Sequence, residues 1–196
     1  MVLSEIRTRV RYHLREATAN IWTDAELTDH INLAQKYVAL RLDSKYLPQL
    51  MKLDLIAFST DATEDLATDF LKAVGNPFHV TKGTLYPLLP FAEAMEAQAH
   101  YLQSGSLFTD RLFSYMAHQS LWLSRWTEAV NITMPYIAAP AALSGDADVS
   151  EIEDGVIDLV IEKATYDSML KTRNTEEMKL ILSALEKRID DLNKRV

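Results

Sequence analysis

The sequence predicts an α+β fold that is mainly helical, with a helical body, an inserted β-rich extension and a C-terminal helical hairpin. Two observations indicate this class. Apolar residues recur at helical spacing near both ends of the chain, and short β-rich runs occupy its middle. We therefore expect the N-terminal helices of the body in residues 1–50, the β-rich extension with a short helix in 51–140, and the hairpin that completes the body in 141–196.

Two helices are expected within residues 2–47. Thr23 stands three residues before Glu26, which is the spacing of a capping box at the start of the second helix. Pro48 ends that helix, because the residue before a proline avoids the helical conformation. The apolar positions are Leu3, Ile6, Val10 and Leu14 on the first helix, and Leu27, Ile31, Ala34, Val38 and Leu42 on the second.

The middle of the chain changes to strand-like composition. Residues 53–58 and 70–74 resemble strands, and residues 90–103 return to helical composition. The clearest β signal is a set of three short runs separated by polar residues, which predicts an antiparallel meander. The three runs are 112–116, 121–123 and 130–137.

After Pro140 the pattern is helical again. One long helix is expected from Ile152 to Met169, capped by Asp148 or Ser150, and a second follows a cap near Asn174. The short break between them predicts an αα-hairpin. The apolar stripe of the last helix consists of Met178, Ile181, Leu182, Leu185, Ile189 and Leu192.

Composition narrows the function classes. The chain contains no cysteine, which excludes disulfides, a thiol nucleophile and a zinc–thiolate site. Its net charge of −8 argues against a dedicated nucleic-acid binder, whose affinity would rest on cations that meet phosphates. No uncharged run approaches the roughly 20 residues that span a bilayer, and no signal peptide is evident, so we expect a soluble protein.

A search for catalytic or metal-binding patterns finds none. None of the five histidines pairs with another at helical spacing, and no glycine-rich phosphate loop or nucleophile elbow is present. The acidic run from Asp146 to Asp158 misses the register of a calcium loop, since the sixth position is Glu151 and the twelfth is Ile157. The simpler interpretation is that these carboxylates favour a helix N-terminus. We expect no enzyme, no cofactor and no metal.

Two groups of residues are candidates for partner or subunit contacts. Trp122, Trp126 and Tyr136 form either the small core of the β-rich part or an exposed aromatic patch. The second group, Lys187, Arg188, Lys194 and Arg195, lies either on a solvated helix face or against carboxylates of a partner. The apolar stripe of the last helix is covered either by the N-terminal helices or by another protein.

Several short motifs follow one another along the chain. They are Leu3-Ser4-Glu5-Ile6-Arg7, Ile21-Trp22-Thr23-Asp24-Ala25-Glu26-Leu27, Ile31-Asn32-Leu33-Ala34, the strand exit Ile132–Pro140, and Asp146-Ala147-Asp148 before a final helix pair. In this order they resemble the adaptor (head-to-tail connector) proteins of tailed bacteriophages. Residues 61–107 share no motif with that family.

The resemblance implies a structural virion protein at the head–tail neck, made in the bacterial cytoplasm. Such a protein is a subunit of an oligomeric ring of about twelve copies. The implied partners are other copies, the portal protein, and tail or nozzle proteins, with no membrane. Viral DNA would pass through the ring without sequence-specific binding, and the C-terminal segment would hold the portal.

The alternative is a soluble, non-enzymatic interaction or regulatory protein that binds one protein partner through its β-rich extension. Self-assembly separates the two hypotheses, because a ring subunit oligomerises either alone or once the portal is present. A small hydrolase that uses Asp or His is the least favoured hypothesis, since the sequence shows no set of catalytic residues that would work together with an Asp or a His.

Overall fold

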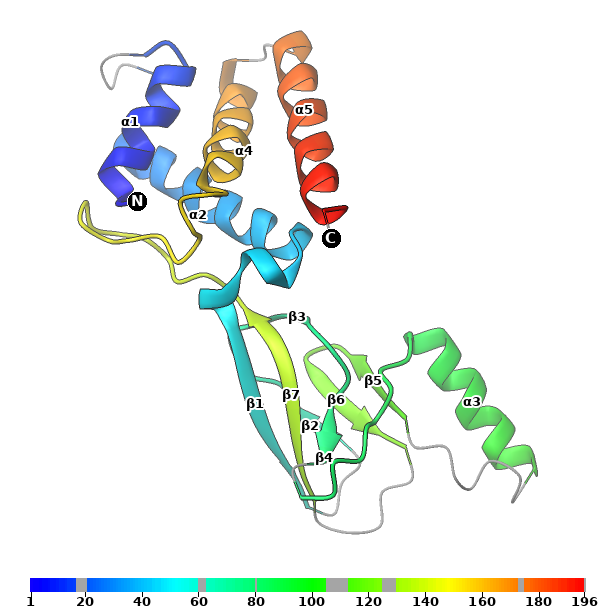
Figure 1. The fold of residues 1–196 in the computed structure, drawn as a ribbon. Coiled ribbons are helices and arrows are strands. Elements are labelled where there is room, and N and C mark those ends of the chain that lie inside the picture. Colours follow the sequence, from blue (N-terminus) through cyan, green and yellow to red (C-terminus); the bar gives the residue numbers. More distant parts are fainter. Residues whose placement is uncertain are drawn as a thin grey trace. The chain divides into compact units, whose positions relative to one another are not determined.

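The chain divides into two compact units in the computed structural model (Figure 1), which describes residues 1–16, 21–59, 63–79, 81–104, 113–124, 130–172 and 175–195. Unit 1 consists of Met1–Leu50 and Ala139–Val196, and unit 2 is Met51–Ala138. Unit 1 is thus assembled from both ends of the sequence. Within the described ranges, no helix is long and apolar enough to cross a membrane.

Unit 1 is built around one central helix. Its α-helices are α1 (Leu3–His13), α2 (Asp24–Arg41), α4 (Ile157–Met169) and α5 (Thr175–Asn193), with short 3₁₀ helices η1 (Ser44–Tyr46), η2 (Pro48–Leu50) and η3 (Leu170–Thr172). Helix α4 contacts α1, α2 and α5. Consecutive residues Leu159, Val160 and Ile161 are all buried, because α4 has neighbours on several sides.

The N-terminal helices confirm the capping box and the apolar stripes, but α2 ends at Arg41, so the prediction that it continues to Pro48 is wrong. The Thr23 hydroxyl accepts a hydrogen bond from the Glu26 amide at 3.2 Å, and the Glu26 carboxylate accepts one from the Thr23 amide at 2.8 Å. This is the expected capping box at the start of α2. The apolar stripes of α1 and α2 are buried at Leu3, Ile6, Val10, Leu27, Ile31, Ala34 and Val38.

Helix α4 begins at Ile157, so the prediction that it starts near Ile152 is wrong. Two of the acidic residues before it, Asp148 and Glu151, accept hydrogen bonds from backbone amides of the preceding loop instead of capping a helix. The Asp148 carboxylate accepts hydrogen bonds from the amides of Ser144 and Gly145 at 2.7 and 2.8 Å, which lowers its pKa. Residues 144–156 therefore form an ordered loop.

Unit 2 contains two antiparallel sheets. The first has the order β1 (Met51–Phe58), β7 (Val130–Ala138) and β3 (Phe70–Ala73), with β4 (Phe78–His79) also paired to β7. The second has the order β2 (Thr63–Asp65), β6 (Ser120–Leu123) and β5 (Ser114–Ala117). Strand β1 lies at an edge, and its register with β7 runs from Met51↔Ile137 to Phe58↔Val130.

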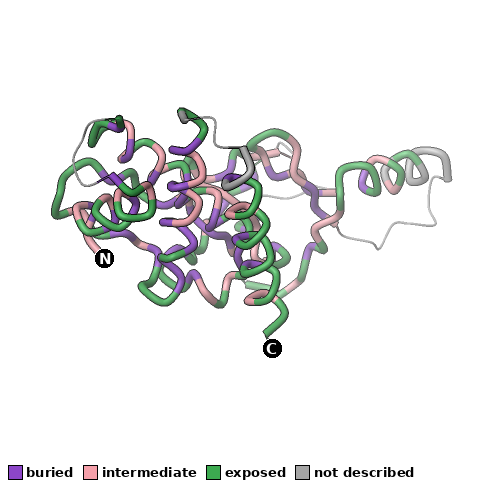
Figure 2. The backbone as a smooth tube through the Cα atoms, turned by 90° about the horizontal axis from the view of Figure 1, so that it is seen from above, coloured by how far each residue is buried: buried purple, intermediate pink, exposed green. Residues whose placement is uncertain are grey.

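A hydrophobic core fills unit 2 between its sheets. Its buried members are Ile56, Phe58, Leu66, Tyr86, Leu121, Leu123, Val130, Ile132 and Met134. Helix α3 (Phe91–Ser104) contributes little to this burial. Among the α3 residues whose burial is described, Ala94 alone is buried (Figure 2).

Two expectations about the β structure are wrong. The fold is mixed α+β and not mainly helical, because the described residues form two sheets beside five α-helices. Strands such as Phe78–His79 are too short to show alternation in the sequence, so the β content was underestimated. The predicted meander is also wrong: β5 and β6 form a hairpin paired to β2, whereas β7 belongs to the other sheet.

Candidate interaction surfaces

Three arginines of α1 tie this helix to other parts of unit 1. The ion pairs join Arg7 to Asp24 and Asp146, Arg9 to Asp158, and Arg11 to Asp24 and Glu16. Arg11 lies 2.7 Å from Asp24, and this hydrogen bond holds the pKa of the Asp24 carboxyl below its usual range. All three arginines are therefore engaged in ion pairs within unit 1.

Trp22 links the segment before α2 to the end of α4. Its indole Nε1–H donates a 3.0 Å hydrogen bond to the Ser168 carbonyl, and its side chain is only 3% exposed. The Ser168 hydroxyl is also 2.8 Å from His30 Nδ1. The tryptophan of the Ile21–Leu27 motif is therefore a structural residue.

Asn32 fastens α2 to the returning chain. Its side-chain amide donates to the Leu143 carbonyl at 3.0 Å and accepts from the Leu143 amide at 2.9 Å. Next to it, the buried Gln35 accepts a 2.7 Å hydrogen bond from the Ser150 hydroxyl. Asn32 and Gln35 thus position residues 143–150 against α2.

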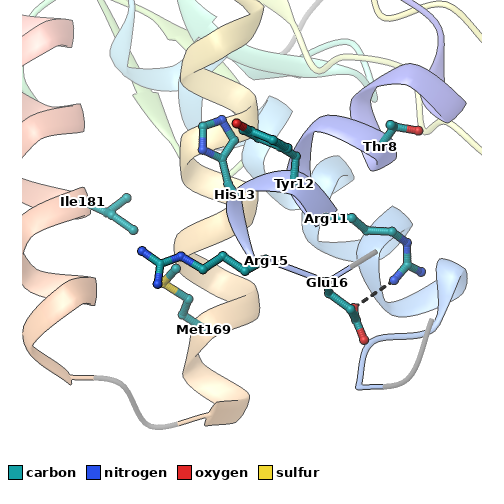
Figure 3. A pocket seen from close by; sticks show the side chains of 8 residues that line it. All are labelled: Thr8, Arg11, Tyr12, His13, Arg15, Glu16, Met169 and Ile181. Carbon is teal, nitrogen blue, oxygen red and sulfur yellow. Dashed lines mark hydrogen bonds and ion pairs between the residues drawn. The ribbon is translucent and has the colours of Figure 1, made fainter. Parts of the chain in front are cut away.

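A pocket of about 830 Å³ opens in unit 1 near the end of α1 (Figure 3). Its walls include Tyr12 and Arg15, with Met169 from α4 and Ile181 from α5. The Arg15 side chain reaches from the end of α1 toward Met169 and Ile181 (Figure 3). No described residue pairs with the Arg15 guanidinium, in contrast to the three arginines of α1.

The predicted aromatic candidates occupy different positions in unit 2. Trp122 is half-buried and stacks on Tyr115, with ring centroids 5.8 Å apart. Tyr115 in turn makes an edge contact with Phe91 at 5.9 Å. Tyr136 is buried in β7, and Trp126 lies outside the described residues. The structure therefore does not bring Trp122 and Tyr136 into one described aromatic contact.

Tyr136 is held by a charged neighbour. Its hydroxyl donates a 2.8 Å hydrogen bond to Asp69, which lies 2.6 Å from Lys52. The Lys52 ammonium lowers the pKa of Asp69, whereas burial and the hydrogen bond to Asp69 raise the pKa of Tyr136 to about 12. Tyr136 thus remains protonated at any physiological pH.

The C-terminal candidates lie on α5 and in the residues directly after it. Lys187, Lys194 and Arg195 are exposed, and Arg188 pairs with Glu162 of α4. The α5 stripe is turned inward, with Met178, Leu185 and Ile189 buried. Unit 1 itself therefore covers much of the stripe whose burial the sequence left open.

An exposed apolar row follows strand β1. Met51, Leu53 and Leu55 alternate along the strand, so they share one face of the sheet, and they are 47%, 70% and 62% exposed. On the same face, Leu53 is paired with Pro135 of β7. We call Met51, Leu53 and Leu55 the β1 row.

Sequence reasoning missed both Arg15 and the β1 row. The alternation of Leu53 and Leu55 with Lys52 and Asp54 was a usable signal, but the sequence does not show which face the protein covers. Arg15 gave no signal, because its position depends on how α1 ends. Among the described residues, no group of three or more histidines and carboxylates could hold a metal ion.

Comparison with known proteins identifies the family of the chain. A search of curated proteins finds no match. The family model described as SU10 adaptor protein matches residues 1–196, which is the whole chain. The chain therefore belongs to the SU10 adaptor protein family, a family of phage structural adaptor proteins.

Proposed function

We propose that the chain is a subunit of an oligomeric ring that links the portal to the tail in the neck of the virion. Family membership supports a role in contacts with other virion proteins. The observation that carries the proposal is the β1 row, an exposed apolar surface on an edge strand. The charged residues Lys52 and Asp54 alternate with the β1 row and point to the other face of the sheet. The face that carries Met51, Leu53 and Leu55 is therefore an exposed apolar patch, which is typical of a protein–protein contact.

Burial of the β1 row would stabilise a complex. Complete burial of one leucine side chain contributes about 1.5–3 kcal/mol, and Leu53 and Leu55 are the most exposed members. Neighbouring copies or tail and nozzle proteins are the proposed occupants of this face. Lys187 on α5 and Lys194 and Arg195 just after it are exposed, and we propose that they meet carboxylates of the portal, together with Arg188 if it leaves Glu162.

The proposed ring surrounds viral DNA without gripping it. The net charge of −8 favours repulsion of phosphates over their capture. The proposal assigns no catalytic activity and no cofactor to the chain, because its polar side chains are engaged in structural contacts such as those of Asn32 and Glu16.

Native mass spectrometry of the purified protein, alone and mixed with portal protein, tests the proposal. We expect a closed oligomer in at least one condition, and the double variant Leu53→Ser/Leu55→Ser should weaken its assembly or its contact with tail proteins. Leu85→Ser is the matched control, because Leu85 is 58% exposed in the same unit but lies outside the β1 row. A wild-type protein that stays monomeric and binds one partner in a 1:1 complex would favour the alternative of a single-partner interaction protein.

A further inference from the structure

Arg15 occupies a backbone position that ordinarily favours glycine. Helix α1 ends in a Schellman motif, in which the Glu16 amide donates to the Arg11 carbonyl at 3.0 Å and the Arg15 amide donates to the Tyr12 carbonyl at 3.1 Å. This motif puts Arg15 at a φ of 55°. A residue with a Cβ is strained there, so the arginine has a cost that glycine would avoid.

The guanidinium of Arg15 is available to a ligand. Arg7, Arg9 and Arg11 are engaged in ion pairs within unit 1, but Arg15 has no partner among the described residues. It borders the pocket of about 830 Å³ beside the apolar side chains of Met169 and Ile181. This volume lies in the range that accommodates a bound group, and an apolar floor strengthens the attraction between Arg15 and a carboxylate.

The exposed face of α2 has the complementary chemistry. Asp29, Leu33 and Leu40 lie opposite the buried stripe of this helix, and the two leucines are 59% and 52% exposed. No described residue pairs with the Asp29 carboxylate. Asp29 and Leu33 are one helical turn apart, so they present a carboxylate and an apolar side chain side by side.

We propose that the pocket of one copy receives the Asp29–Leu33 face of α2 from the next copy. Asp29 pairs with Arg15, and Leu33 packs against Met169 and Ile181. This inference rests on the proposed ring, and it specifies the contact between its subunits. The two surfaces are different patches of unit 1, so each copy both donates and accepts, and such a head-to-tail contact closes into a ring when its rotation allows.

A DNA phosphate is the competing occupant of a site that contains an unpaired arginine. The charged lining does not distinguish the two occupants, because Arg15 attracts and Glu16 repels a carboxylate and a phosphate alike. The apolar side chains of Met169 and Ile181 do distinguish them, since they gain a packing partner from Leu33 but nothing from a phosphate. The Asp29–Leu33 pair matches both parts of the pocket, because Asp29 pairs with the Arg15 guanidinium and Leu33 packs against the apolar side chains.

Charge reversal tests the contact. Arg15→Asp and Asp29→Arg should each weaken self-association at least about tenfold, and the double variant should restore it. Both variants should fold, because aspartate tolerates positive φ and Asp29 is on an exposed helix face. Self-association is measured by sedimentation or native mass spectrometry in the condition where the wild type assembles. Single variants that assemble normally would refute this contact and leave the ring proposal standing, whereas a wild type that never assembles would refute both.

Glycine substitutions provide a matched pair. Arg15→Gly should raise the melting temperature yet impair assembly, since it removes both the strain and the guanidinium. His118→Gly is the control, because His118 has a φ of 56° in unit 2, remote in sequence from the pocket residues, and its replacement should leave assembly unchanged. If both variants assemble like the wild type, Arg15 is not a contact residue. DNA binding by both variants is compared with that of the wild type in a gel-shift assay. If Arg15→Gly assembles normally but binds DNA more weakly than the wild type, the pocket binds phosphate and the proposal is wrong.

The absence of cysteine makes a geometric test possible. Lys36 is exposed one turn from Leu33 on α2, so a cysteine there leaves Asp29 and Leu33 in place. A Tyr12→Cys/Lys36→Cys variant, treated with a short bifunctional maleimide after assembly, should yield a ladder of covalent oligomers. A head-to-tail contact joins every copy to two neighbours, whereas a two-fold contact between like surfaces stops at dimers. A dimer band alone, or no product from assembled material, would overturn the proposed contact.

Discussion

Replacement of Trp22 by phenylalanine removes one defined hydrogen bond from unit 1. The indole Nε1–H donates to the Ser168 carbonyl at 3.0 Å, and both residues are buried. Loss of such a bond costs about 0.5–1.5 kcal/mol. The smaller phenyl ring leaves part of the indole volume empty, which adds roughly 1 kcal/mol. We therefore expect Trp22→Phe to lower the free energy of unfolding by about 2 kcal/mol.

Urea unfolding followed by far-ultraviolet circular dichroism measures this loss. With a slope of about 2 kcal/mol per molar urea, the midpoint should fall by about 1 M. Trp122→Phe is the matched control, because Trp122 is half-buried and its stacking on Tyr115 survives with a phenyl ring. The control should change stability by less than about 0.5 kcal/mol. Equal losses in the two variants would refute the role of the Trp22 hydrogen bond.

Three further predictions concern hydrogen-bonded and charged groups. Asn32→Ala should cost about 2–3 kcal/mol and speed hydrogen exchange at the Leu143 amide, because it leaves that buried backbone amide and carbonyl unpaired. Tyr136→Phe should cost about 1–2 kcal/mol in thermal unfolding, since the bond to the Asp69 carboxylate is charge-assisted; an unchanged melting temperature would contradict this. Hydrogen bonds from the Lys171 ammonium and from Thr23 lower the pKa of Glu26 from 4.5 to about 2. The associated stability is therefore present above pH 4.5 and is lost as the pH falls toward 2, so Glu26→Gln should flatten the dependence of stability on pH in that window.

Local signals in the sequence predicted individual elements better than their assembly. The capping box at Thr23 and the 3.6-residue periodicity gave α1 and α2, because these interactions join residues close in sequence. Strand pairing joins distant residues, so the partner of β7 could not be deduced. Strand β7 follows β6 in the sequence but pairs with β1. These two strands are far apart in the sequence, and the local pattern of apolar residues carries no information about such distant pairing.

The acidic run from Asp146 to Asp158 is a second case in which a local signal did not give the correct structure. Asp148 was assigned to a helix start, because carboxylates favour that position. In the structure it binds the amides of Ser144 and Gly145, and α4 begins later. A carboxylate satisfies loop amides and helix-start amides equally well, so composition alone does not distinguish the two. The free guanidinium of Arg15 could not be predicted either, since its neighbours Met169 and Ile181 come from the other end of the chain.

The two proposed contact surfaces differ in how they respond to salt. The pair between Arg15 and Asp29 is electrostatic and lies at a pocket mouth, so a rise in ionic strength should screen it. The β1 row, in contrast, is apolar, and salt does not weaken its burial.

Assembly of the wild type should therefore become weaker between low and moderate salt, and Arg15→Gly should abolish most of that dependence. The variant Leu53→Ser/Leu55→Ser should assemble less well at every salt concentration and keep the wild-type slope. Sedimentation at several ionic strengths measures both quantities. If the slope persists in Arg15→Gly, another ion pair controls the contact between subunits. If the wild type shows no slope, apolar surfaces such as the β1 row dominate assembly, because screening affects charges alone.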